Sequence, residues 1–289
     1  MSVVEVIVLG SIVGGIWALV ASGFSLVFGV ARVLNFAHGT YFALGAYFAF
    51  VLYTVLSNVV PSTAALLIAS AVACLMVGFV GVAIYTFTVK PVRNYEIMVI
   101  LVTLAVALLI KEILLSVFSD VSISVPTFVS GFISIAGIPV TYTRILAFVL
   151  SISIIAVLDY FVNRTKLGKE IIATSQDCEA AMLVGINVER VFTVTMFLSA
   201  LLAGIGGILY AQIYAVNPMT ALRVLIYAFA IVILGGLGSV RGSIVAAFIV
   251  GYMEVAVSTL FASEWAEVVA MLTIIAILIA RPRGIMGEG

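Results

Sequence analysis

The chain has 289 residues, of which 65% are hydrophobic and 9% charged, and its formal net charge is zero. In soluble domains roughly a quarter of all residues are charged. The much lower charged fraction here excludes a soluble protein and predicts an all-α, polytopic membrane protein. A chain without net charge has nothing that would recruit nucleic acid. A membrane β-barrel is also excluded, because runs such as 244–253 are apolar at successive positions whereas barrel strands alternate.

Charges, prolines and glycines divide the chain into apolar segments of the length that crosses a membrane, about 20 residues. These segments are 6–31, 36–57, 62–89, 97–118, 144–163, 191–214, 224–240, 242–262 and 266–280. The segment 224–240 is short and ends in a glycine-rich stretch, so it is either a full span or a re-entrant helix. We therefore expect one transmembrane helical bundle over residues 1–289, with about 8–10 spans.

The first span carries small residues at intervals of four and three, which places them on one helix face. Small faces let helix backbones approach closely in lipid, so we expect this span to lie inside the bundle. The residues are Ser11, Gly15, Ala18, Ser22, Ser25 and Gly29.

Asn35 and His38 bring hydrogen-bonding groups to the start of the second span. Polar groups at membrane depth usually face a cavity or a partner, so both residues are candidates for a translocation pathway. A structural polar cap near the membrane surface is the alternative. His38 is the only histidine, and no other residues with suitable spacing accompany it, so no metal site is predicted.

Lys111, Glu112 and Glu254 are charged residues deep within apolar segments, where each needs a partner or water. Lys111 and Glu112 are adjacent and point about 100° apart on a helix, which predicts a poor ion pair between them. Lys111 and Glu254 lie at similar depths from the predicted cytoplasmic ends. We therefore expect a buried Lys111–Glu254 ion pair, with a role of Glu254 in a substrate or water pathway as the alternative.

Two longer connections lie on opposite sides of the predicted bundle. The connection 119–143 contains prolines, glycines and β-branched residues, which predicts a short hairpin or an irregular cap. The connection 164–190 is rich in charges of both signs. Most short-loop lysines and arginines fall on its side, so 164–190 and the C-terminus are predicted to be cytoplasmic and 119–143 external. The side of the N-terminus stays open, because one miscounted span would reverse it.

The polar connection 164–190 reads as a helical segment built to hold another protein. In its middle stands the pattern Glu179-Ala180-Ala181, followed by Gly185. This element resembles the coupling loop of bacterial ABC-transporter permeases. Three further patches resemble the permeases of branched-chain amino acid ABC importers and occur in matching order along the chain: Asn35-Phe36-Ala37-His38-Gly39, Leu234-Gly235-Gly236-Leu237-Gly238-Ser239 and Arg281-Pro282-Arg283-Gly284-Ile285-Met286-Gly287.

This resemblance implies a permease subunit in a prokaryotic inner membrane that docks on its ATPase through Glu179, Ala180, Ala181 and Gly185. It further implies two cytoplasmic ABC ATPases, a second and paralogous permease, and an external solute-binding protein. The chain contains no Gly-x-x-x-x-Gly-Lys-Ser/Thr phosphate loop, so ATP hydrolysis is expected on the partner subunits and not on this chain. The adjacent charges of Lys111 and Glu112 depart from the uncharged polar residues expected in such permeases.

Two alternatives accompany this interpretation. Close relatives of such permeases carry urea or short amides, and the sequence does not separate them from amino acid carriers. A stand-alone, ion-coupled secondary transporter that uses Glu254 is the alternative from a different class, since such carriers place carboxylates near the membrane midplane. The docking loop argues against it. No set of catalytic side chains surrounds His38, so neither an enzyme nor a cofactor is predicted.

Overall fold

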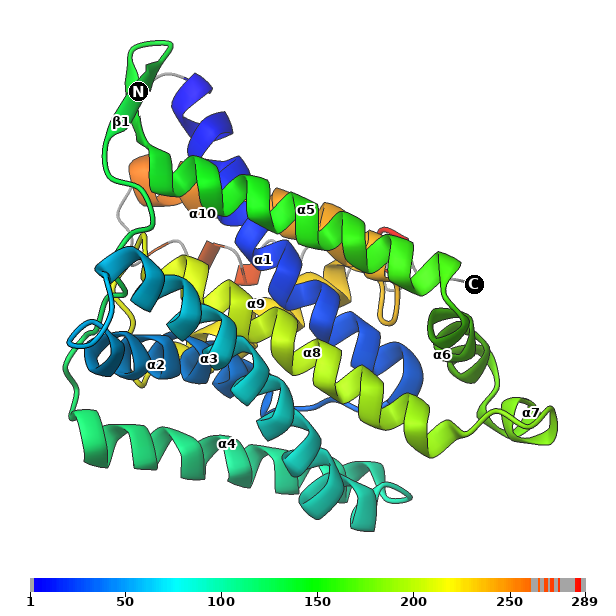
Figure 1. Ribbon diagram of the computed structural model, residues 1–289. Coiled ribbons are helices and arrows are strands. Elements are labelled where there is room, and N and C mark those ends of the chain that lie inside the picture. The colour runs from blue at the N-terminus through cyan, green and yellow to red at the C-terminus, as the bar shows by residue number, and fades with distance from the viewer. Residues whose placement is uncertain are drawn as a thin grey trace.

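The computed structural model describes residues 3–260 together with 265, 268–269, 271–272, 275 and 284–286. Long helices dominate this part of the chain (Figure 1). They are α1 (Val3–Ala31), α2 (His38–Leu56), α3 (Ser62–Ile84), α4 (Glu96–Phe118), α5 (Tyr142–Arg164), α6 (Lys166–Gln176), α7 (Cys178–Leu183), α8 (Val188–Ala211), α9 (Thr220–Gly235) and α10 (Val240–Leu260). A π-helical turn (Tyr85–Val89) and a 3-10 turn (Lys90–Val92) extend α3.

Within the described residues, seven helices are long and apolar enough to cross a membrane: α1, α2, α3 with its extension, α4, α5, α8 and α10. The predicted polytopic helical bundle is therefore confirmed. Helix α9 has 16 residues and spans about 24 Å, less than the roughly 30 Å of a hydrocarbon core. This agrees with the short segment expected at 224–240. The segment predicted at 266–280 lies largely outside the described residues.

Helix α1 lies inside the bundle, as its small face predicts. It packs against α10, α8, α5 and α9. Its contact with α10 is close because glycines meet there: Gly10 lies against Tyr252, and Gly14 lies against Gly251 and Phe248. A side chain at Gly14 would push the two backbones apart, so these glycines set the distance between α1 and α10.

The connection 119–143 forms the predicted hairpin. Strands β1 (Phe132–Ile135) and β2 (Ile138–Thr141) pair antiparallel, with Phe132 opposite Thr141 and Ile135 opposite Ile138. The two turn residues Ala136 and Gly137 both have positive φ angles, +51° and +85°. Positive φ at both positions is the geometry of a type I′ turn, whose twist matches that of the paired strands.

The two ends of the bundle differ. The hairpin and the start of α1 lie at one end, and α6 and α7 lie at the other (Figure 1). The basic residues that predict a cytoplasmic side gather near α6 and α7: Arg32 donates to the carbonyl oxygens of Ser175 and Gln176, and Lys90 and Arg93 bind Glu189. The start of α1 is therefore at the end opposite to the 164–190 connection.

Candidate functional site

Helix α7 begins and ends with well-defined caps. The Asp177 carboxylate accepts hydrogen bonds from the backbone N–H groups of Glu179 and Ala180, at 2.9 and 3.0 Å. At the other end, Gly185 N–H donates to the carbonyl of Met182 and Ile186 N–H donates to that of Ala181, both at 3.0 Å. These two bonds form a Schellman motif, in which the residue after the helix takes the left-handed conformation. Gly185 has that conformation, with φ of +84°.

One side of α7 holds it to the protein and the other is exposed. Ala181 is buried, whereas Glu179 and Ala180 are exposed. The end of the helix presents apolar side chains to the surroundings: Leu183 is 89% exposed and Val184 is 77% exposed. Contiguous exposed apolar side chains at the polar end of a membrane protein are typical of a protein-binding surface. We call Glu179, Ala180, Met182, Leu183 and Val184 the α7 surface.

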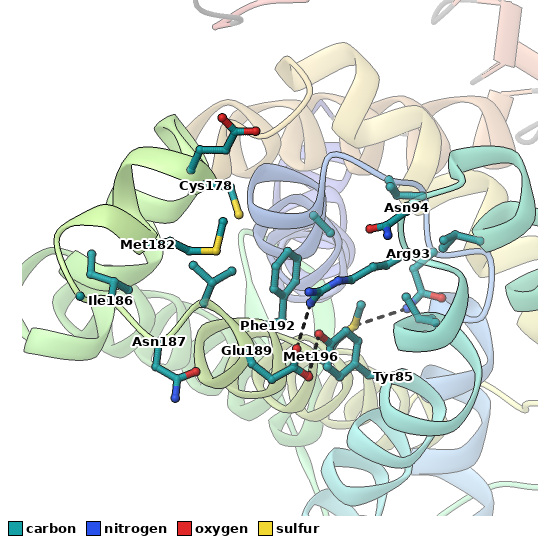
Figure 2. Close-up of a pocket in the computed structure, with 18 residues that line it drawn as sticks. Tyr85, Arg93, Asn94, Cys178, Met182, Ile186, Asn187, Glu189, Phe192 and Met196 are labelled. Atoms are coloured by element: carbon teal, nitrogen blue, oxygen red, sulfur yellow. Dashed lines mark hydrogen bonds and ion pairs between the residues drawn. The ribbon is translucent and has the colours of Figure 1, made fainter.

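Behind the α7 surface lies a cavity of about 780 Å³, which opens between α7, the start of α8, the end of α3 and the segment that precedes α2 (Figure 2). Its lining includes Glu179 and Gly185 from the predicted coupling element and Asn35 from the predicted pathway. The structure thus brings together two groups of predicted site residues that are more than a hundred positions apart in the chain. A movement of α7 would change the shape of a space that reaches Asn35.

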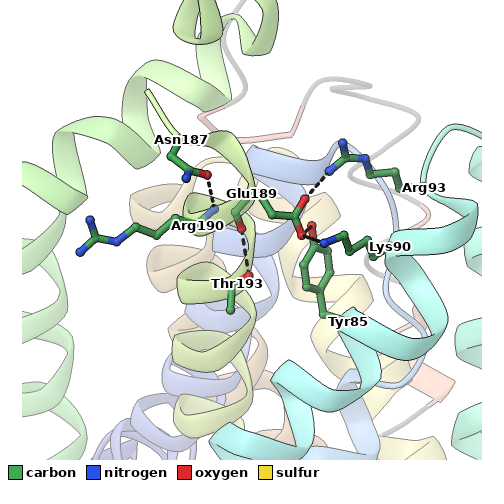
Figure 3. A network of polar contacts seen from close by, with 7 residues as sticks. All are labelled: Tyr85, Lys90, Arg93, Asn187, Glu189, Arg190 and Thr193. Atoms are coloured by element: carbon green, nitrogen blue, oxygen red, sulfur yellow. Dashed lines mark hydrogen bonds and ion pairs between the residues drawn. The ribbon is translucent and has the colours of Figure 1, made fainter. Parts of the chain in front are cut away.

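A polar network holds one wall of this cavity (Figure 3). The carboxylate of Glu189, in the first turn of α8, binds Lys90 Nζ through Oε1 and Arg93 through Oε2, each at 2.9 Å. The Tyr85 hydroxyl donates to Glu189 Oε1 at 3.3 Å, and the Arg93 guanidinium lies 5.8 Å from the centre of the Phe192 ring. A carboxylate in a first helical turn is also favoured by the helix dipole. The network fastens the start of α8 to the end of α3.

Sequence reasoning did not assign a role to this network or to the apolar end of α7. Lys90 and Arg93 served only as indicators of the cytoplasmic side, and Glu189 only as one charge of the loop. A signal was present for the α7 surface, since Leu183 and Val184 are apolar residues in an otherwise polar segment. No signal pairs Glu189 with residues 96 positions or more away.

Asn35 and His38 have different surroundings. Asn35 accepts from the Ala37 N–H at 3.0 Å, donates to the Tyr41 hydroxyl at 3.4 Å, and lines the cavity. His38 is buried, with Nε2 2.9 Å from the Val20 carbonyl oxygen and Nδ1 3.2 Å from the Ser199 hydroxyl. A carbonyl only accepts, so Nε2 donates and Nδ1 accepts from Ser199. His38 thereby ties the start of α2 to α1 and α8 inside the bundle.

The expected Lys111–Glu254 ion pair is not formed. Helix α4 packs on α2 and on the turns after α3, whereas α10 packs on α1 and α9, and the two helices lie on different sides of the bundle (Figure 1). Lys111 Nζ instead lies 2.7 Å from Glu112 Oε1. The flexible lysine side chain reaches its neighbour despite the 100° between them. Lys111 and Glu254 are predicted to pair because of their similar depths, but α4 and α10 do not pack against each other.

Glu254 is part of a different cluster. Its carboxylate accepts from Trp17 Nε1 at 2.7 Å, and the Trp17 ring stacks on Tyr227 with 4.9 Å between ring centres. Glu254 is not among the residues that line the cavity described above. The three candidate pathway residues are therefore dispersed: Asn35 lines the cavity, His38 is buried between α2, α1 and α8, and Glu254 on α10 bonds to Trp17 on α1. Within the described part of the chain, no group of metal-ligating side chains is present.

Comparison with known proteins identifies the family. The family model described as "Branched-chain amino acid transport system / permease component" matches residues 6–278. The permease protein BraD of a high-affinity branched-chain amino acid transport system in Pseudomonas aeruginosa is 28% identical over 288 residues, covering 96% of this chain and 94% of BraD. LivH of Escherichia coli K12, a permease protein of the same description, is 26% identical with the same coverage.

A solved structure, PsaBC from Streptococcus pneumoniae in complex with Fab, has a similar fold, with a TM-score of 0.50 at 12% identity over 98% of this chain and 93% of that one. This likeness concerns the fold alone. The family model, in contrast, spans nearly the whole sequence and all the elements that form the cavity. The chain therefore belongs to the family of permease components of branched-chain amino acid transport systems.

Proposed function

We propose that this chain imports branched-chain amino acids by alternating access, coupled through the α7 surface to ATP hydrolysis on a partner. Membership of the family makes the chain a transport subunit of an ABC importer and not an enzyme. Such a subunit works with ATPase and binding-protein partners. The ion-coupled alternative receives no support from the family. The coupling proposal rests on one observation: Glu179 and Gly185 of the predicted coupling element line the same cavity as Asn35.

In the proposed mechanism, the ATPases bind the α7 surface and move it when they close on ATP. Helix α7 is joined to α8 by a short connection, and the Glu189 network joins α8 to α3. A displacement of α7 therefore passes to two spans that line the cavity. Leu183 and Val184 are exposed apolar residues in this chain. They would become buried when the ATPase binds and would form the apolar centre of that interface.

The complete transporter in this proposal contains two cytoplasmic ATPases, a second, paralogous permease and an external solute-binding protein. It lies in the inner membrane of a prokaryotic cell, with the α6–α7 end and the C-terminus in the cytoplasm and the start of α1 outside. The gathering of Arg32, Lys90 and Arg93 at the α6–α7 end supports this orientation. The hairpin at the opposite end is then available to the binding protein.

The assignment of branched-chain amino acids rests on the relatives, and the cavity offers both polar and apolar contacts. Leucine, isoleucine and valine are small zwitterions with apolar side chains, and the cavity combines polar side chains such as Asn35 with apolar ones such as Phe192 and Met196. The family and the relatives support branched-chain amino acids over urea or a short amide.

The test is uptake of radiolabelled solutes by cells that lack the gene. We expect uptake of leucine, isoleucine and valine to be lost on deletion and restored by the intact gene. Replacement of residues 128–138 by a short Gly/Ser linker should also abolish uptake, because it removes β1 and the hairpin turn. Urea and an unrelated sugar serve as controls. Persistent leucine uptake with loss of urea uptake would contradict the substrate and leave the permease assignment intact.

A further inference from the structure

A pocket adjoins the hairpin of β1 and β2, which lies at the end of the bundle opposite to α7 (Figure 1). Its volume is about 310 Å³, at the lower end of the range for small-molecule sites. The segment 127–131, the start of α5 and the residues that follow α8 line it. Among the described lining residues, the only charged side chain is that of Arg144. The pocket is therefore suited to an anionic group.

The start of α5 adds to this preference. Thr143 and Arg144, in the first turn of this 23-residue helix, line the pocket, and the side chain of Thr141, the described residue before the helix, does not cap it. The first N–H groups of a helix have no partners within the helix and favour a negative charge. The Arg144 guanidinium lies 5.9 Å from the centre of the Tyr214 ring, which leaves its N–H donors available to a ligand.

Gln212 gives an independent indication of a ligand. It lines the same pocket, it is only 8% exposed, and its amide Nε2 is buried without a hydrogen-bond partner among the described residues. A buried N–H donor without an acceptor is unfavourable, and most such groups in proteins are satisfied. The last torsion of a glutamine side chain is soft, so the amide turns readily. A carboxylate held by Arg144 would supply the acceptor that Gln212 lacks.

Groups that suit an ammonium and an aliphatic side chain follow from Arg144 toward the bundle. The ring of Tyr214 lies 4.9 Å from that of Tyr210, and Tyr210 lies 6.3 Å from Trp17, which donates to the Glu254 carboxylate. Aromatic faces attract cations and offer apolar contact area. A small amino acid with an apolar side chain can use both the donors of the pocket and these rings. An acidic side chain of a docking protein would use the donors alone.

We propose that this pocket binds the α-carboxylate of an amino acid that enters the bundle from the hairpin end, with Arg144 and Gln212 as the residues that hold it. The proposal rests on the proposed function, since it takes a branched-chain amino acid as the solute and the hairpin end as external. The site lies at the other end of the bundle from the cavity behind α7. It would receive the solute before that cavity does.

Protection of an introduced thiol tests the pocket in the complete transporter, purified in lipid nanodiscs without binding protein. In a chain with Cys74→Ala and Cys178→Ala, Ser130→Cys places a thiol at the pocket, and Ser134→Cys on β1 is the matched control. Both serines are exposed. The reagent is the anionic sulfonatoethyl methanethiosulfonate. We expect leucine to slow modification at Ser130→Cys several-fold, leucinamide, which lacks the carboxylate, to have no effect, and modification at Ser134→Cys to stay unchanged.

Two variants connect this protection to the proposed residues. Arg144→Gln and Gln212→Leu should each remove the protection by leucine. Gln212→Leu replaces an unsatisfied buried amide by an apolar group of similar size, which is expected to leave folding intact. Retention of the ATPases monitors folding of both variants. If Arg144→Gln is not folded, Gln212→Leu decides.

The proposal is overturned if leucine gives no protection, if leucinamide protects as well as leucine, or if protection survives Gln212→Leu. A second arm adds unloaded binding protein without leucine. Protection by the binding protein where leucine gives none would assign the pocket to docking and not to the solute. Leucine uptake by the unmodified transporter is measured alongside. Absence of uptake contradicts the proposed function, whereas normal uptake without protection contradicts the pocket alone.

Discussion

At the scale of single residues, the backbone conformation of Gly185 allows the turn that ends α7. Its φ of +84° is in the left-handed region, and no atom lies within 4 Å of where a side chain would begin. The glycine is thus required by the turn and not by crowding within the chain. Gly185 also lines the cavity next to α7.

We predict that Gly185→Leu abolishes transport and ATPase stimulation while the protein still inserts. A branched residue in the left-handed conformation costs about 1–2 kcal/mol, so Gly185→Leu would strain or reshape the turn that ends α7. Gly185→Asn is the matched control, because asparagine tolerates this conformation, and it should retain a measurable share of activity. Leucine uptake and membrane yield are measured for both. Wild-type uptake by Gly185→Leu would remove this turn from the mechanism.

Asn35 and His38 should respond differently to alanine because only Asn35 lines the cavity. Asn35→Ala is expected to lower uptake several-fold, because the Asn35 side chain forms part of the cavity wall. His38→Ala removes the hydrogen bonds to the Val20 carbonyl and to the Ser199 hydroxyl inside the packed bundle, which costs about 1–3 kcal/mol. Its melting temperature in detergent should therefore fall. The reverse pattern would place His38, and not Asn35, in the pathway.

At the scale of elements, the Glu189 network connects α8 to the end of α3. Glu189 is about one-third exposed, and exposed ion pairs contribute only about 0–1 kcal/mol each. We therefore predict that Glu189→Gln changes stability by no more than about 1 kcal/mol and lowers the stimulation of ATP hydrolysis by loaded binding protein several-fold. Glu170→Gln, on the neighbouring α6, is the control. Equal stimulation in the two variants would mean that the network only holds the fold.

The exposed end of α7 should determine ATPase binding. Leu183→Asp with Val184→Asp is expected to reduce co-purification of the ATPases more than tenfold, because charges would replace the apolar contact area. Lys169→Ala, at an exposed position of α6, should leave co-purification unchanged. Quantitative mass spectrometry of the purified complex measures both. ATPases retained at the wild-type level by the double variant would place their binding surface elsewhere.

The sequence predicts the elements of this fold well because the lipid environment restricts the conformations of the backbone. Spans must satisfy their own backbone hydrogen bonds, so long apolar segments become helices. The turn between β1 and β2 is likewise visible as a glycine among β-branched residues. Helix neighbours are not predictable in the same way, since spans apolar on all sides do not show which face meets which helix. This is why the predicted Lys111–Glu254 pair is wrong. Glu189, Lys90 and Arg93 lie at helix ends that are far apart in the chain, so no sequence pattern indicates that they meet.

At the scale of the whole molecule, α1 packs against α10, α8, α5 and α9, and α8 in turn packs against α2 and α3. The cavity lies at the end of the bundle that carries α7. The hairpin is at the opposite end. A binding protein at the hairpin and an ATPase at α7 would thus act on opposite ends of the same central helices. This arrangement is what alternating access across the bundle requires.

The central claim is that this chain carries branched-chain amino acids only when ATP hydrolysis and a binding protein act on its two ends. The direct test is uptake of radiolabelled leucine into proteoliposomes that contain the purified transporter, with and without internal ATP and external binding protein. We predict accumulation only when both are present, and its loss with Gly185→Leu. Leucine accumulation driven by a sodium or proton gradient, without ATP or binding protein, would contradict the account.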